Sequence, residues 1–271
     1  MALNRAGMGT WAGRLVFGLA AATLLASFAL AGETSAPPSK AGPAGEFDAP
    51  IKEVTVDLGR NPVYPAGDAH DILSCYYFPQ LLVKELDVKG NVGSEWLSIL
   101  RSRDALPACK RSHEPGERVI KYPEWNGYFW GVKAGLVFFS CSEFAQASCS
   151  FAVYDSTSGK KLFTDDVAVT NKGRDIHMQV FSTKAGVVAR YDAAANAGCD
   201  LYKAADCWKK VKAKFGLKSD RKPDCPGYPE VYKLFQTDED ESMIAYPVEV
   251  TLSSRPSVKT VAGPIQCWPT I

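Results

Sequence analysis

The chain has 271 residues, and its 31 Lys and Arg side chains nearly balance its 30 Asp and Glu side chains. Hydrophobic residues make up 46% of the chain, and its length is enough for one large domain or two small ones. The near-neutral charge excludes a dedicated nucleic-acid binder, because such proteins carry a clear basic excess.

Residues 1–31 have the pattern of a cleavable signal peptide. Arg5 and Arg14 are their only charged side chains, an apolar run follows, and Ala29-Leu30-Ala31 fits the small-x-small cleavage pattern. An uncleaved membrane anchor is the alternative, but the apolar run of about 16 residues is shorter than the ~20 needed to span a bilayer. We therefore predict export, a mature chain of about 240 residues and no membrane span after cleavage.

The exported chain should begin with a tether and continue as one folded domain. Residues 32–50 are rich in Pro, Gly and Ala, which predicts a flexible linker. Residues 51–271 are predicted to form a single mainly β domain. Short alternating or apolar runs predict its strands near 54–58, 72–78, 96–100, 119–120, 128–130, 136–139, 151–154, 161–164, 176–181, 187–191 and 244–252.

Turn and capping residues refine this prediction. Asn126-Gly127 favours a hairpin between its flanking strands, and further hairpins are expected at 155–159 and near Gly186. Pro79 could open a short helix that runs through Asp87. A second helix is predicted after Asp206, which would cap it, and Gly216 would end it.

These elements predict a mainly β fold of antiparallel meanders with a few short helices. A propeller-like array and a sandwich are both compatible with the spacing. A partial repeat supports the meanders, since Lys-Ala-Gly at 133–135 recurs at 184–186.

Eight cysteines follow the signal peptide, and an even number in an exported chain indicates disulfides. Zinc is the alternative, but none of them forms a close C-x2-C pair. Eight cysteines allow 105 pairings, so the sequence alone does not fix the connectivity. Equal short spacing favours Cys141–Cys149 and Cys199–Cys207, and for the other four we expect Cys75–Cys109 and Cys225–Cys267.

Motifs of catalysis are missing from the sequence. No G-x-S-x-G elbow, Walker A loop or G-x-G-x-x-G is present, so we expect no catalytic residue and no cofactor. The three histidines are far apart and predict no metal site. Paired carboxylates, the usual glycosidase machinery, occur at Glu85 with Asp87 and at Asp165 with Asp166, and the acidic run 238–241 lacks the spacing of a calcium loop.

Two features favour binding. Trp125, Tyr128 and Trp130 could form an aromatic platform for a sugar or a protein, with Phe129 on the opposite strand face. A basic run could engage an anionic lipid, a cell-wall polymer or an acidic partner; it consists of Lys203, Lys209, Lys210, Lys212, Lys214, Lys218, Arg221 and Lys222.

The sequence thus predicts an exported, non-catalytic binding or structural protein with a protein or carbohydrate partner. The missing N-x-[ST] sequon favours a bacterial source and a periplasmic or extracellular location. Two alternatives remain, an extracytoplasmic hydrolase acting on carbohydrate and a secreted inhibitor or effector that binds a foreign protein.

Overall fold

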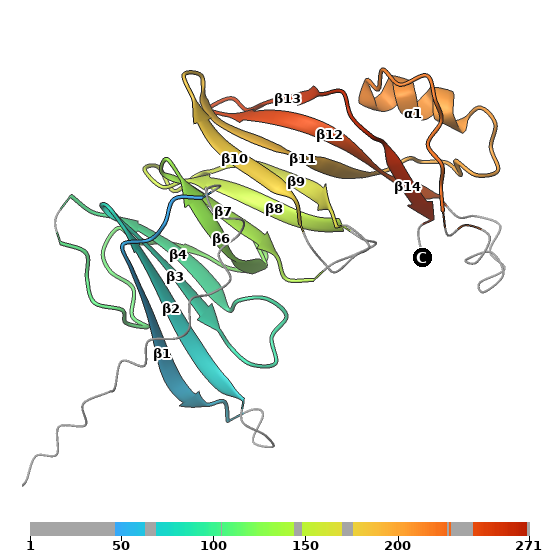
Figure 1. Ribbon diagram of the computed structural model, residues 1–271. Helices are drawn as coiled ribbons and strands as arrows, with labels where there is room; N and C mark the ends of the chain where they lie inside the picture. The colour runs from blue at the N-terminus through green and yellow to red at the C-terminus, as the bar shows by residue number, and fades with distance from the viewer. Residues whose placement is uncertain are drawn as a thin grey trace, which may run out of the picture. The chain divides into compact units, whose positions relative to one another are not determined.

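The computed structural model describes residues 47–62, 69–103, 105–143, 148–169, 176–226, 228 and 241–269. Within these ranges the chain forms antiparallel strands and one helix (Figure 1). The elements are β1 (Lys52–Arg60), β2 (His70–Phe78), β3 (Leu81–Asp87), β4 (Trp96–Arg101), β5 (Arg118–Ile120), β6 (Gly127–Lys133), β7 (Leu136–Cys141), β8 (Ser148–Asp155), β9 (Lys161–Ala168), β10 (Met178–Thr183), β11 (Gly186–Asn196), α1 (Cys207–Phe215), β12 (Ser242–Leu252), β13 (Ser257–Thr260) and β14 (Gln266–Pro269).

The strands form two sheets, and both are meanders. The first has the order β1-β2-β3-β4-β5. The second runs β13-β12-β11-β9-β8-β7-β6, with β10 beside β11 and β14 beside β12. The 11-residue strand β11 joins the two parts of the second sheet: it pairs with β12 along its length and with β9 only at Ala193 and Val167.

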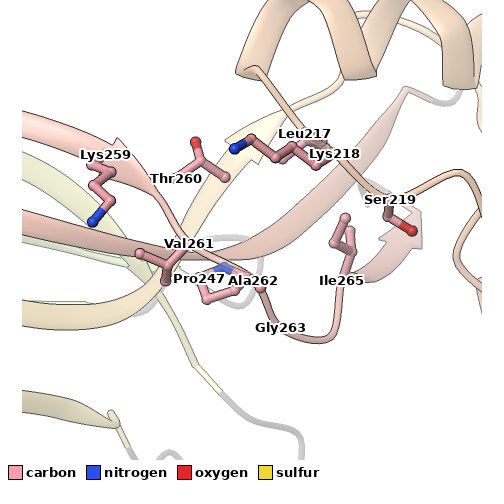
Figure 2. A pocket seen from close by; sticks show the side chains of 10 residues that line it. All are labelled: Leu217, Lys218, Ser219, Pro247, Lys259, Thr260, Val261, Ala262, Gly263 and Ile265. Atoms are coloured by element: carbon pink, nitrogen blue, oxygen red, sulfur yellow. The ribbon is translucent and has the colours of Figure 1, made fainter.

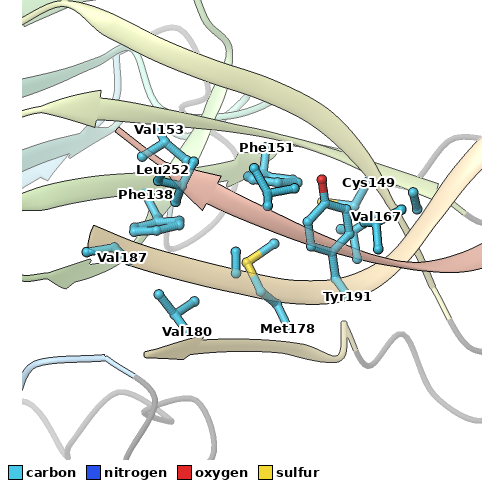
Figure 3. Packing of buried hydrophobic residues seen from close by; sticks show 14 of the residues in the cluster. Phe138, Cys149, Phe151, Val153, Val167, Met178, Val180, Val187, Tyr191 and Leu252 are labelled. Atoms are coloured by element: carbon cyan, nitrogen blue, oxygen red, sulfur yellow. The ribbon is translucent and has the colours of Figure 1, made fainter. Parts of the chain in front are cut away.

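Strands β7 and β8 are covered on both faces, as adjacent residues of β7 show. Phe139 packs with Val83 and Ile99 of the first sheet. Its neighbour Phe138 points the opposite way, as the two-residue period of a strand requires, into a core shared with β10, β11 and β12 (Figure 3). The strands are therefore arranged as three packed layers.

A third core holds α1 against the end of β12. Trp208 and Val211 of the helix pack with Ile244 of β12 and with Leu217. Gly216 ends the helix in the left-handed conformation, as predicted. No helix in the described ranges is long and apolar enough to cross a membrane.

Four disulfides join Cys75 to Cys109, Cys141 to Cys149, Cys199 to Cys207 and Cys225 to Cys267. The two short pairs are those that equal spacing favours, and the two longer pairs match the pairing expected for the remaining cysteines. All four are consistent with an oxidising extracytoplasmic environment. A buried ion pair also holds the β4–β5 connection, because the Lys84 ammonium on β3 lies 2.8 Å from a carboxylate oxygen of Glu117 in that connection.

The expected mainly β fold of antiparallel meanders is confirmed. The arrangement of the layers establishes neither the propeller nor the sandwich.

Two local predictions are wrong. The segment after Pro79 is the strand β3, because Gln80 takes a φ of 61° and closes a tight turn to β2. Both faces of β3 are buried, so the run lacks the polar alternation that marks a strand. Asp206 precedes α1 as expected but makes no side-chain capping bond; its carboxylate lies 2.8 Å from Lys210 instead.

The predicted hairpin at Asn126-Gly127 is also wrong. The strand before it, β5, pairs with β4, and the strand that Gly127 begins, β6, pairs with β7. Gly127 is needed for close packing, because a Cβ there would lie 1.7 Å from the Ser140 carbonyl oxygen. The hairpins predicted at 155–159 and near Gly186 are confirmed as β8–β9 and β10–β11.

Candidate functional site

A break in the pairing along the outer edge of β12 creates the candidate site. Residues 248–251 pair with β13 and residues 242–245 pair with β14, which leaves Tyr246 and Pro247 between them. Proline has no N–H to donate to a neighbouring strand. The chain therefore leaves the edge after β13, and residues 261–265 bulge outward opposite only two residues of β12.

This bulge is fixed to β12 at its base. The Val261 N–H donates to the Pro247 carbonyl at 3.0 Å. Gly263 packs directly on the proline ring, since a Cβ there would lie 2.7 Å from Pro247 Cγ. A side chain at position 263 would push the loop away from the strand.

The helix supplies the opposite wall. Leu217 is buried, and its N–H donates to the Lys212 carbonyl at 3.0 Å. Thr260 on β13 donates its hydroxyl to the Phe215 carbonyl at 3.1 Å. The Cys225–Cys267 disulfide joins the chain after α1 to β14. The two walls of the site are therefore held together by one hydrogen bond and one disulfide.

Together these walls enclose a cleft of about 500 Å³ (Figure 2). Apolar side chains and a small turn form most of it, and two lysines stand at its edge. Its lining residues are Leu217, Lys218, Ser219, Pro247, Lys259, Thr260, Val261, Ala262, Gly263 and Ile265. None of these ten has a carboxylate, an imidazole or a thiol, so the lining offers a charged and apolar surface without an acid–base pair.

The charge at the cleft is positive. Lys218 makes no ion pair with any described residue. Lys259 lies 3.9 Å from Glu249, but that carboxylate is held more closely by Arg190, at 2.7 Å. A distant exposed pair compensates little charge, so both ammonium groups remain available to an anion.

A second cavity of about 300 Å³ lies on the other side of Pro247 and Val261, which line both cavities. His177, Arg190 and Asp192 give it a polar wall. Burial raises the pKa of Asp192, and His177 offsets part of that shift. Of the two cavities, neither is lined by two carboxylates.

The structure separates the three predicted aromatic ligand-binding residues. Trp125 packs against the core between the sheets and donates its indole N–H to the Ser140 carbonyl at 3.2 Å. Trp130 packs in the other core, against Phe151. Tyr128 is half-buried on β6. Trp125 and Trp130 therefore serve different layers and do not form one platform.

Half of the predicted basic run, four of its eight residues, lies along α1, and none of those four lines the cleft. Lys210 pairs with Asp206 and Lys212 with Asp220, each at 2.8 Å. Lys218 is the member of the run that lines the cleft.

Carboxylates of both predicted pairs accept hydrogen bonds from neighbouring residues of the fold. Glu85 accepts hydrogen bonds from Ser94 Oγ at 2.9 Å and from the Phe129 N–H at 3.0 Å. Asp165 accepts one from the Tyr191 hydroxyl, and burial raises the pKa of this carboxyl. Asp166 accepts one from Ser150.

No group of His, Cys, Asp and Glu suited to a metal ion occurs among the described residues. His70 lies 2.6 Å from Asp57, and His113 lies 3.2 Å from Glu117. Most of the acidic run, residues 238–240, lies outside the described ranges.

Sequence reasoning missed the β13 wall of the cleft. Lys259, Val261 and Ile265 belong to no motif, and they come together only because β13 and β14 pair with the same strand. Pro247 within a predicted strand was the available signal, because proline in a strand marks an interrupted edge.

Comparison with protein-family models, with curated proteins and with solved structures finds no match.

Proposed function

We propose that this chain is an exported, non-catalytic binding protein of the bacterial cell envelope, and that the cleft beside α1 is its ligand site. The observation that carries the proposal is the composition of the cleft: an apolar floor with Lys218 and Lys259 at its edge and no acid–base pair. The signal-peptide pattern of residues 1–31 supports export.

The ligand that fits this lining has an anionic group and an apolar body. The ammonium groups of Lys218 and Lys259 would bind the anionic group, and Leu217, Val261 and Ile265 would contact the apolar part. The volume of about 500 Å³ lies within the ~300–1,000 Å³ of pockets for small molecules. An acidic lipid or a similar anionic amphiphile has this chemistry.

The test is calorimetric titration with octyl phosphate, and uncharged 1,2-octanediol serves as the matched ligand. We expect saturable binding of the phosphate, and weaker binding of the diol. The double variant Lys218→Gln/Lys259→Gln should lose about tenfold or more in affinity. The control Lys209→Gln/Lys222→Gln removes the same charge from exposed positions outside the lining and should bind as the native protein does. Equal loss in both variants, or no binding by the native protein, would overturn the proposal.

A further inference from the structure

An exposed tyrosine, Tyr122, lines a small polar pocket that shares no residue with the cleft. The Tyr122 side chain is 79% exposed, and the nearby Val92 is 50% exposed. They line a pocket of about 190 Å³ together with Asn91, Ser94, Glu95 and Asn126. An exposed aromatic ring offers an apolar face and a polar hydroxyl to a ligand.

The turn that carries Tyr122 is firmly held. The Lys121 carbonyl accepts the Glu124 N–H at 2.9 Å. Arg118 binds both oxygens of the Glu124 carboxylate at 2.6 Å. Trp125, the next residue, is anchored in the core. The aromatic ring is therefore presented on an ordered turn, which lowers the entropy lost on binding.

The facing wall is the β3–β4 connection, and it is locked to the same turn. The Ser94 N–H donates to the Gly127 carbonyl at 3.1 Å. Gly93, at a φ of +83°, packs so closely that a Cβ would lie 2.2 Å from Asn126 Oδ1. These contacts fix the distance between the two walls of the pocket.

The polar groups of the pocket match the hydroxyl groups of a sugar. The Asn91 amide donates to one Glu95 oxygen at 2.7 Å, which leaves the second oxygen as an acceptor. The Asn126 amide makes no hydrogen bond with a described residue, so it can both donate and accept. Amide and carboxylate groups can form hydrogen bonds with the hydroxyls along the edge of a pyranose ring, and an aromatic ring can pack against its C–H face.

We propose that this pocket binds an uncharged pyranose, with Tyr122 stacked on the ring and with Asn91, Glu95 and Asn126 bonded to its hydroxyls. The volume is below the ~300 Å³ of pockets for drug-sized ligands, which suits a single ring. The Glu95 carboxylate repels acidic sugars. This site is separate from the cleft beside α1, so either can fail without the other.

The experiment is an amide NMR titration of the whole mature protein with methyl glycosides of glucose, galactose, mannose and N-acetylglucosamine. We expect at least one of them to give saturable shifts at residues 91–95 and 122–127. Tyr122→Ala should weaken that binding about tenfold or more, and Tyr122→Phe should retain it. Val258→Ala, at another exposed apolar residue, is the control and should change nothing.

Two results would overturn the saccharide site: no saturable shift with any of these glycosides, or equal affinity of Tyr122→Ala and the native protein. Unchanged spectra outside the pocket would show that the variants are folded. Titration of the same sample with octyl phosphate tests the cleft beside α1 separately, because the cleft and this pocket share no residue.

Discussion

Glu85 lies on β3 with its carboxyl group between the two sheets. Burial raises its pKa to about 7; the hydrogen bonds from Phe129 and Ser94 oppose that shift, and the charge of Asp87 adds to it. In the unfolded chain the same group has a pKa near 4.5. The folded protein therefore retains this proton over a pH range in which the unfolded chain loses it.

This difference predicts a loss of stability as the pH rises from about 4.5 to about 7. Over that range the unfolded state binds fewer protons, so the free energy of unfolding should fall by about 2–3 kcal/mol on account of Glu85. Glu85→Gln should remove this slope. Urea unfolding of both proteins at several pH values measures the difference; parallel pH profiles would contradict the assignment.

Glycines show what the sequence could and could not reveal at this scale. Gly216 ends α1 and was predicted, because helix termination is local. Gly127 was assigned to a hairpin, whereas its role is to let β6 approach β7. That role depends on the contact with Ser140 of β7, more than ten residues away, so the residues around Gly127 do not indicate it.

At the scale of elements, the segment before β1 packs onto β6. The Phe47 ring lies 5.2 Å from that of Phe138, between ring centroids, and covers Gly131, where a Cβ would lie 2.4 Å from the ring. The Asp48 N–H donates to the Val132 carbonyl at 2.7 Å. Residues 47 and 48, within the predicted linker, thus contact the folded core.

We expect Phe47→Ala to lower the free energy of unfolding by about 2 kcal/mol, because it exposes an apolar face of β6 and β7. Ile51→Ala is the matched control, since that side chain is 71% exposed, and it should have little effect. Chemical denaturation of both variants makes the comparison. A stability of Phe47→Ala equal to that of the control would show that the contact is not maintained in solution.

Most strands could be predicted because apolar and β-branched runs are local signals. The strand β3 could not, since both its faces are buried and Leu81 to Leu86 lack alternation. The packing of the layers was also out of reach. It depends on which face of β7 meets which layer, and the adjacent residues that point to the two faces, Phe138 and Phe139, are the same amino acid.

For the whole molecule, we predict that the exported protein has lost its signal peptide and has all of its cysteines in disulfides. Mass spectrometry of the protein recovered from the periplasm or medium of a bacterial host should find an N-terminus at Gly32 and no cysteine open to alkylation without a reductant. The described cysteines are all paired, which is the physical reason. Retention of residues 1–31, or several alkylated thiols, would contradict export through a cleaved signal peptide.

The candidate cleft was the least predictable part of the molecule. Lys218 was visible within the basic run, but Lys259 lies far from it in sequence and meets it only through the pairing of β12 with β13. The predicted aromatic platform of Trp125, Tyr128 and Trp130 does not include Tyr122, the exposed ring that lies three residues before Trp125.

The break in the outer-edge pairing of β12 at Pro247 has a consequence for self-association. Because the last layer ends in β13 and β14, each of four residues, an incoming strand from another molecule would find no long continuous row of free backbone groups. Shortening the bulge at 261–265 to the two residues that match Tyr246 and Pro247 would allow one longer edge to form. Such a protein would lose the proposed ligand cleft and gain an edge open to strand addition, so the same irregularity guards against aggregation.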